Sequence, residues 1–156
     1  MNTRAAVFLF LLSCLGFACG GDSLTARGEF SLQLSDSREG FTFPQDVTLG
    51  EGEVPDGAFR GFCTFAGDGA RISIENPQGE GLRRVGVAVA DLRPEATTAQ
   101  VDAEVRDDRY SGACDIDVLY AFRGESFGFR LDCELDSGSA TGRATSELHF
   151  NGCDSE

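Results

Sequence analysis

Residues 113–135 read ACDIDVLYAFRGESFGFRLDCEL, two runs in which apolar and polar residues alternate on either side of Arg123-Gly124. Alternation with a period of two is typical of a strand that buries one face. A two-residue turn at Arg123-Gly124 would join the runs into a hairpin. Its apolar face would then consist of four facing pairs: Cys114 with Cys133, Ile116 with Leu131, Val118 with Phe129, and Tyr120 with Phe127. Because a slip by one residue would turn one apolar set to solvent, the pattern also predicts the register.

The rest of the chain repeats this pattern in short runs separated by Gly, Pro, Asn and Asp. The runs that we predict to be strands are 29–34, 42–49, 58–65, 71–75, 83–90, 100–105, 113–121, 127–135 and 143–150. Such spacing is typical of an all-β fold, and we expect an antiparallel β-sandwich or flattened barrel of about eight or nine strands. Pro44 should confine its run to a sheet edge. The only candidate for a helical turn is Pro94 to Thr98.

The first residues have the pattern of an export signal. Arg4 precedes an apolar run, AAVFLFLL at 5–12, which is too short to cross a bilayer as a helix. Small residues, Gly16 and Ala18, stand three and one before Cys19, where signal peptidases accept small side chains. We therefore predict a signal peptide at 1–18 and a mature chain that begins at Cys19.

Residues 1 to about 23 resemble the type II signal peptide of bacterial lipoproteins. The resemblance implies that Cys19 receives diacylglycerol and that its new amino group receives an acyl chain such as palmitate. Gly16 departs from the family pattern, in which Leu is typical, and residues 11–13 before Cys14 match it better. Lipidation of Cys14 is therefore one alternative, although it would leave an odd number of other cysteines. Cleavage without lipidation, giving a secreted or periplasmic protein, is the other.

A flexible tether should follow the lipid, because residues 19–27 are mostly small and polar. Lipoproteins retained at the inner membrane commonly have Asp directly after the lipidated cysteine, and this chain has Gly20. The resemblance therefore implies anchoring in the outer membrane. Residues 28–156 are expected to form a single domain.

The chain is strongly acidic, with a net charge of −13. Removal of residues 1–18, which contain Arg4 and no acidic residue, gives −13 − 1 = −14 for the mature chain. A surface of this charge repels nucleic acid, so we expect no nucleic-acid partner.

Two disulfides are predicted from the cysteines that remain once Cys19 is lipidated, an even set in an oxidising compartment. The hairpin register places the Cα atoms of Cys114 and Cys133 about 5.5 Å apart, within the reach of a disulfide. By elimination Cys63 would pair with Cys153, while two other connectivities remain open. Zinc binding is the alternative, but no two of these cysteines have the C-x-x-C spacing.

The polar face of the hairpin offers one weak candidate for a metal site. The register places Asp115 opposite Asp132 and Asp117 opposite Arg130. Like charges that face one another destabilise a sheet unless a cation lies between them, and carboxylates suit calcium. The alternative, which we favour, is a solvated acidic face compensated by Arg130.

No catalytic constellation emerges from the sequence. The single histidine, His149, shares a strand face with Glu147 and Asn151, and we interpret it as an ordinary surface residue. There is no G-x-S-x-G sequence, and no cofactor motif. We therefore expect a non-enzymatic envelope protein.

Two kinds of function remain as hypotheses. The first is a binding module for a protein or carbohydrate partner, and the second is a structural or protective acidic lipoprotein, with a calcium-binding β-domain as a remote third. An exposed aromatic patch would favour the first. Phe59 and Phe62 are predicted on opposite faces of one strand, so either both faces are buried or one ring is exposed.

Overall fold

Strands make up most of the chain in the computed structural model, which describes residues 23–92 and 97–156. The strands are β1 (Thr25–Gln33), β2 (Arg38–Thr48), β3 (Arg60–Ala66), β4 (Gly69–Glu75), β5 (Leu82–Val89), β6 (Thr97–Val105), β7 (Asp108–Phe122), β8 (Ser126–Asp136), β9 (Thr141–Asn151) and β10 (Asp154–Ser155). The predicted all-β fold is confirmed. Within the described residues there is no helix long and apolar enough to cross a membrane.

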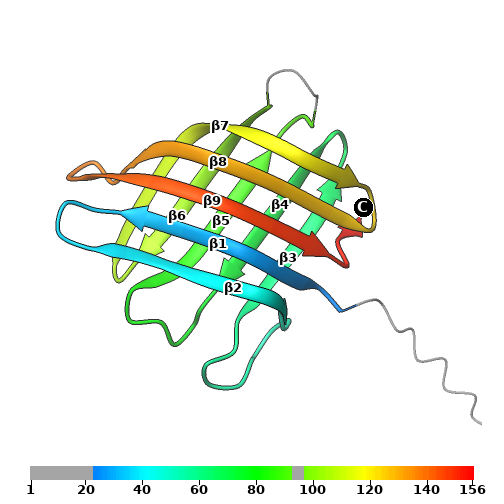
Figure 1. Ribbon diagram of the computed structural model, residues 1–156, viewed down its shortest axis with the longest axis horizontal. Helices are drawn as coiled ribbons and strands as arrows, with labels where there is room; N and C mark the ends of the chain where they lie inside the picture. The colour runs from blue at the N-terminus through cyan, green and yellow to red at the C-terminus, as the bar shows by residue number, and fades with distance from the viewer. Residues whose placement is uncertain (1–22, 93–96) are drawn as a thin grey trace, which may run out of the picture.

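All these strands belong to one curled sheet with the order β10-β3-β4-β5-β6-β7-β8-β9-β1-β2. Neighbours are antiparallel except for β10 and β3, which are parallel. The sheet curves into a half-barrel, so that β7, β8, β9, β1 and β2 lie across the core from β3 to β6 (Figure 1). β2 ends the order, which confirms that Pro44 lies in an edge strand.

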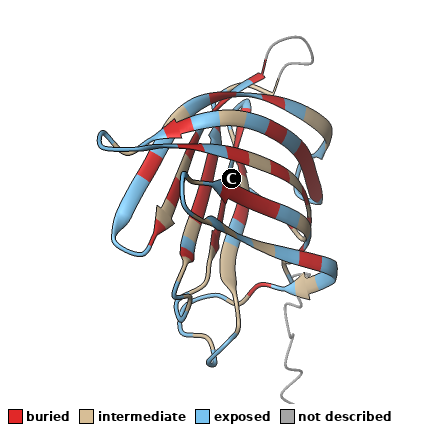
Figure 2. Ribbon diagram, turned by 60° about the vertical axis from the view of Figure 1, so that its left-hand side comes forward, coloured by how far each residue is buried: buried red, intermediate tan, exposed pale blue. Residues whose placement is uncertain are grey.

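The alternation seen in the sequence sets which face of each strand is buried. In β6 the odd-numbered residues from Thr97 to Val105 are buried and the even-numbered ones are more exposed. The same alternation is visible along β9 and in the banding of the strands in Figure 2. Each predicted run coincides with one of β1 to β9, with differences at the ends. β10 was not predicted, because two residues are too few to show a period.

Large apolar side chains from both sides of the half-barrel meet in its core. Phe30, Phe65, Phe127, Phe129 and Phe150 are fully buried. The rings of Phe65 on β3 and Phe127 on β8 meet edge to face, with centroids 5.9 Å apart. Full burial of each such side chain stabilises the fold by about 1.5–3 kcal/mol, so these contacts hold the two sides of the curled sheet together.

Both predicted disulfides are present. Cys114 on β7 is bonded to Cys133 on β8, with Cα atoms 5.6 Å apart. Cys153, in the turn between β9 and β10, is bonded to Cys63 on β3, with Cα atoms 4.7 Å apart. The second bond ties the end of the chain to the opposite side of the half-barrel and places β10 beside β3.

The hairpin of β7 and β8 differs from the prediction at its turn. The turn has three residues, 123–125, with Gly124 in the left-handed region at φ 71°. The predicted pairs Ile116–Leu131 and Val118–Phe129 are confirmed. The register then shifts between Val118 and Tyr120. Tyr120 consequently faces Gly128 rather than Phe127, so the predicted Tyr120–Phe127 pair is wrong. The longer turn and the bulge together move Tyr120 from the core face to the outer face.

Other differences concern the ends of segments. β1 begins at Thr25 with Ala26 fully buried, so the ordered domain starts before Arg27, where we expected the tether to end. Thr97 and Thr98 belong to β6 rather than to a helical turn, and 94–96 lie outside the described residues. Residues 1–22, which include the predicted signal peptide (1–18) and the two lipidation candidates, Cys14 and Cys19, lie outside them as well.

Candidate functional site

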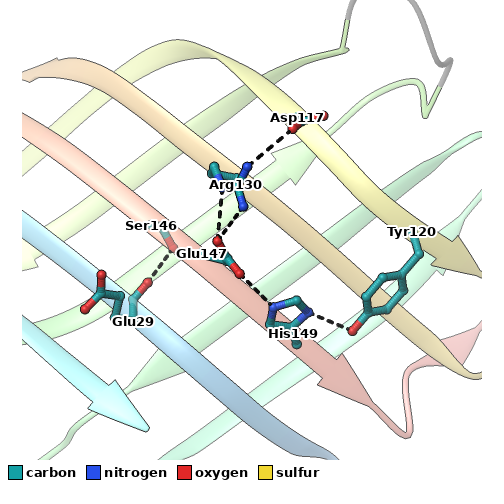
Figure 3. A network of polar contacts seen from close by, with 7 residues as sticks. All are labelled: Glu29, Asp117, Tyr120, Arg130, Ser146, Glu147 and His149. Atoms are coloured by element: carbon teal, nitrogen blue, oxygen red, sulfur yellow. Dashed lines mark hydrogen bonds and ion pairs between the residues drawn. The ribbon is translucent and has the colours of Figure 1, made fainter. Parts of the chain in front are cut away.

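The outer face of β7, β8 and β9 carries a connected set of polar and aromatic side chains (Figure 3). Its members come from alternate positions of strands whose other residues fill the core. Tyr120 comes from β7, Arg130 from β8, and Glu147 and His149 from β9. Because neighbouring strands fix these positions through main-chain hydrogen bonds, the side chains project from a rigid surface.

Gly128 on β8 allows the side chains of the two flanking strands to meet. It pairs with Tyr120 on one side and with His149 on the other. The Tyr120 ring passes over it, and a Cβ at this position would lie 2.6 Å from Tyr120 Cε1. The phenol oxygen thereby comes within 3.0 Å of His149 Nδ1, and the two rings stack with centroids 5.7 Å apart and planes at 23°.

Phe122 extends this stack towards the end of β7. Its ring lies against Tyr120 with centroids 6.1 Å apart and planes at 26°. The residue is 58 % exposed, more than any other large apolar residue in the described chain. We call Phe122, Tyr120 and His149 the aromatic row; it runs across β7, β8 and β9.

A line of charged groups continues from the aromatic row. His149 Nε2 lies 3.3 Å from Glu147 Oε1, and the other oxygen of Glu147 accepts hydrogen bonds from Arg130 Nη2 at 2.7 Å and Nε at 3.0 Å. A carboxylate can only accept, so in the neutral imidazole Nε2 donates to Glu147 and Nδ1 accepts from Tyr120. On the far side Arg130 Nη1 lies 3.9 Å from Asp117.

Two pKa shifts follow from these contacts. The hydrogen bond from Arg130 is the main cause that lowers the pKa of Glu147, and the contact with His149 adds to it. Burial raises the pKa of Tyr120 above its usual 10.0, a change that Arg27 opposes and Asp46 reinforces. At neutral pH the phenol therefore keeps its proton, and the arrangement offers hydrogen-bonding groups rather than an ionised nucleophile.

A hollow of about 420 Å³ lies beside this network. It is lined by Arg27, Gly28, Glu29, Thr42, Phe43, Pro44, Glu147 and His149. Gly28 has φ 120°, and a Cβ there would clash with the Glu147 carbonyl oxygen, so the glycine lets β1 approach β9 closely. The hollow gives a ligand access to the side chains of Glu147 and His149 from the β2 side.

The carboxylates considered for calcium each have a protein partner. Asp132 accepts hydrogen bonds from Arg143 at 2.6 and 2.7 Å, which lower its pKa. Asp117 faces Arg130, and Asp115 accepts a hydrogen bond from Thr98 Oγ1 at 3.3 Å. Across residues 23–92 and 97–156 no three His, Cys, Asp or Glu side chains converge on a point that could hold a metal ion.

His149 is not the ordinary surface residue that we expected. Its side chain is only 19 % exposed and lies between Tyr120 and Glu147. The prediction missed the contact because it placed Tyr120 on the core face. An isolated glycine in a strand often marks the close approach of another group, so Gly128 was the available signal.

One of the predicted alternatives for Phe59 and Phe62 is confirmed. Phe59 packs against Phe43 with centroids 4.9 Å apart, at the margin of the core. Phe62 is 48 % exposed on the outer face of β3. Phe62 and Phe122 are thus the two strongly exposed large apolar residues of the described chain, and they lie on strands from opposite sides of the half-barrel (Figure 1).

Comparison with known proteins gives no relative from which a role could be transferred: no protein family, no curated protein and no solved structure matches this chain.

Proposed function

We propose that this protein is a non-enzymatic binding module, lipidated at Cys19 and anchored in the outer membrane, that holds a protein partner on the aromatic row. One observation carries the proposal. The exposed ring of Phe122 is fixed against Tyr120, which in turn stacks on and hydrogen-bonds to His149.

A rigid exposed aromatic side chain is the kind of residue that dominates binding energy in protein interfaces. Such residues are most effective at the centre of an interface with polar groups around them. Glu147, Arg130 and Asp117 supply that polar margin here. Since their positions are fixed by strand pairing, little conformational entropy is lost when a partner binds.

The charge of the chain supports a partner with a basic surface. With a net charge of −13 for the whole chain, and −13 − 1 = −14 once residues 1–18 with Arg4 are removed, the protein attracts positively charged proteins and repels acidic ones. This complementarity would raise the rate of association and make it sensitive to salt.

Site-specific photo-cross-linking in the native host tests the binding face. A photoreactive amino acid would be introduced at Phe122 and, as a control, at Arg71, an exposed residue of β4. We expect a discrete adduct with one protein from position 122 and none from position 71. Equal labelling from both positions, or no adduct from position 122, would contradict the proposal.

The anchor requires a separate test with a matched pair of variants. Intact mass spectrometry of Cys19→Ala and Cys14→Ala proteins, expressed in the native host, would show which cysteine carries the lipid. We expect the Cys14→Ala protein to keep its acyl chains in the membrane fraction and the Cys19→Ala protein to lack them. The opposite result would show that Cys14 carries the lipid. An unlipidated wild-type chain would contradict the lipid anchor altogether.

A further inference from the structure

A second site lies on the other side of the half-barrel, where Phe62 projects from the outer face of β3. We propose that this site binds a neutral oligosaccharide, with one sugar ring stacked on Phe62. The site is distinct from the aromatic row, and its argument does not depend on the protein partner proposed there.

The surface around Phe62 is a groove made of two adjoining hollows. One of about 330 Å³ includes Arg60, Ser73 and Glu75 in its lining, and the other of about 500 Å³ extends to Asp154. Both are lined by Gly50, Glu51 and Phe62. Phe62 therefore stands between two hollows that could hold successive units of a chain.

The loop between β2 and β3 forms one wall of this groove and is held in place by the main chain. Gly50 N donates to Phe59 O at 3.0 Å, and Gly61 N donates to Gly50 O at 3.1 Å. A loop fixed at this point by main-chain hydrogen bonds gives the groove a preformed shape, as expected of a ligand site.

Ser73 supplies the observation that points to a ligand. Ser73 on β4 pairs with Phe62 on β3 and is only 2 % exposed. Its hydroxyl group is buried and has no hydrogen-bond partner among the described residues, and Ser73 is one of the residues that line the smaller hollow. A buried hydroxyl without a partner is unfavourable, and a hydroxyl group of a ligand in the hollow would satisfy it.

The charges around the groove restrict the chemistry of that ligand. Arg60 forms an ion pair with Glu75, and Glu51 is part of the lining of both hollows. An anionic ligand would meet these carboxylates and a cationic one would meet the Arg60 guanidinium. A neutral ligand that both donates and accepts hydrogen bonds suits a groove that contains both carboxylates and a guanidinium group.

A sugar ring has this chemistry. Its hydroxyl groups can accept from Arg60, donate to Glu51 or Glu75 and pair with Ser73, while the C–H groups of its face can lie on the Phe62 ring. Phe62 is the one large apolar side chain in the lining of the smaller hollow, so a peptide side chain would meet a single aromatic face there rather than an enclosed apolar pocket. The groove therefore favours a carbohydrate over a peptide.

The test measures binding of cellotetraose, maltotetraose and chitotetraose to the mature lipidated protein in a detergent without a sugar headgroup. Isothermal titration calorimetry would compare wild type with Phe62→Ala, Phe62→Tyr, Ser73→Ala and Phe122→Ala. Phe122→Ala is the matched control, because it removes the other strongly exposed ring of the described chain, on the opposite side of the half-barrel. Far-UV circular dichroism would confirm that every variant is folded.

We expect at least one of the three oligosaccharides to bind, with affinity about tenfold or more lower in Phe62→Ala, as for a central aromatic contact. Ser73→Ala should also weaken binding, while Phe62→Tyr and Phe122→Ala should retain it. The proposal would be overturned if none of the three bound, if Phe62→Ala bound as wild type does, or if Phe122→Ala lost binding equally. Absence of a protein adduct from position 122, together with sugar binding by the wild-type protein, would overturn the partner proposed for the aromatic row and leave this site standing.

Discussion

Gly128 and Tyr120 face one another across β8 and β7, and the glycine leaves the space through which the Tyr120 ring reaches His149. A Cβ on Gly128 would lie 2.6 and 2.7 Å from ring atoms of Tyr120, closer than two carbon atoms approach without strain. The stack on the outer face therefore depends on the absence of a side chain at one position of the neighbouring strand.

Gly128→Ala should displace the Tyr120 ring and separate it from His149. We expect the free energy of unfolding to fall by about 1–3 kcal/mol, the usual cost of an added methyl group in a closely packed place. Urea unfolding gives the stability change, and the NMR signals of the His149 ring report whether the stack is lost.

A double-mutant cycle separates this contact from a general effect of alanine in the strand. In a Tyr120→Ala background the added methyl group at Gly128 has no ring to meet, so the same substitution should cost much less. An equal cost in both backgrounds would show that the Tyr120 contact is not the cause.

Tyr120→Phe tests the hydrogen bond to His149 while keeping the ring. Because the phenol is partly buried and lies 3.0 Å from Nδ1, its removal should lower the free energy of unfolding by about 0.5–1.5 kcal/mol. Thermal unfolding followed by circular dichroism measures this change. A variant as stable as wild type would mean that water replaces the lost contact at no cost.

Much of the fold could be predicted because the strands bury one face each. In β6, residues 97–105 alternate between buried and more exposed along the whole strand, and this period is visible in the sequence. The pairing of Cys114 with Cys133 followed from the same alternation in β7 and β8. The order of the strands in the sheet could not be predicted, because it depends on how segments far apart in the sequence, such as β3 and β10, meet.

The candidate site was missed because a local irregularity reverses the pattern. One extra residue between Val118 and Tyr120 moves Tyr120 to the outer face, while its apolar character still suggests the core. Bulges of this kind depend on the turn and on tertiary packing, so alternation alone does not show them. The exposure of Phe62 likewise depends on the half-barrel, since only one face of β3 is covered.

The lowered pKa of Glu147 makes its contact with Arg130 sensitive to pH. A carboxyl group whose pKa is lower in the folded than in the unfolded state stabilises the fold above the unfolded pKa. That contribution is lost as pH falls through the folded pKa, and it is small here because the side chain is exposed. In Arg130→Gln the pKa of Glu147 should rise towards its ordinary value of 4.5, as measured by NMR titration of the carboxyl carbon.

A second ion pair on the same face provides the control for this titration. Asp132 owes its lowered pKa mainly to Arg143. Its pKa should stay low in Arg130→Gln and should rise in Arg143→Gln, while that of Glu147 should follow the reverse pattern. If either substitution moved both carboxyl groups equally, the shifts would reflect the overall charge of the face rather than these two contacts.

The two disulfides should contribute unequally to stability because they close loops of different length. Cys63 and Cys153 are 90 residues apart and Cys114 and Cys133 are 19 apart. In the chain-entropy account each disulfide raises the free energy of the unfolded chain, the first by about 4–5 kcal/mol and the second by about 3 kcal/mol. Urea unfolding of the two double-serine variants should therefore show the larger loss for the Cys63→Ser, Cys153→Ser protein. Equal losses, or a larger loss for the hairpin pair, would mean that local packing of the sulfur atoms outweighs loop length.

The Cys63–Cys153 disulfide also affects the groove at Phe62, because Cys63 lines the larger hollow. Removal of that disulfide should therefore weaken sugar binding, whereas removal of the hairpin disulfide should leave it unchanged.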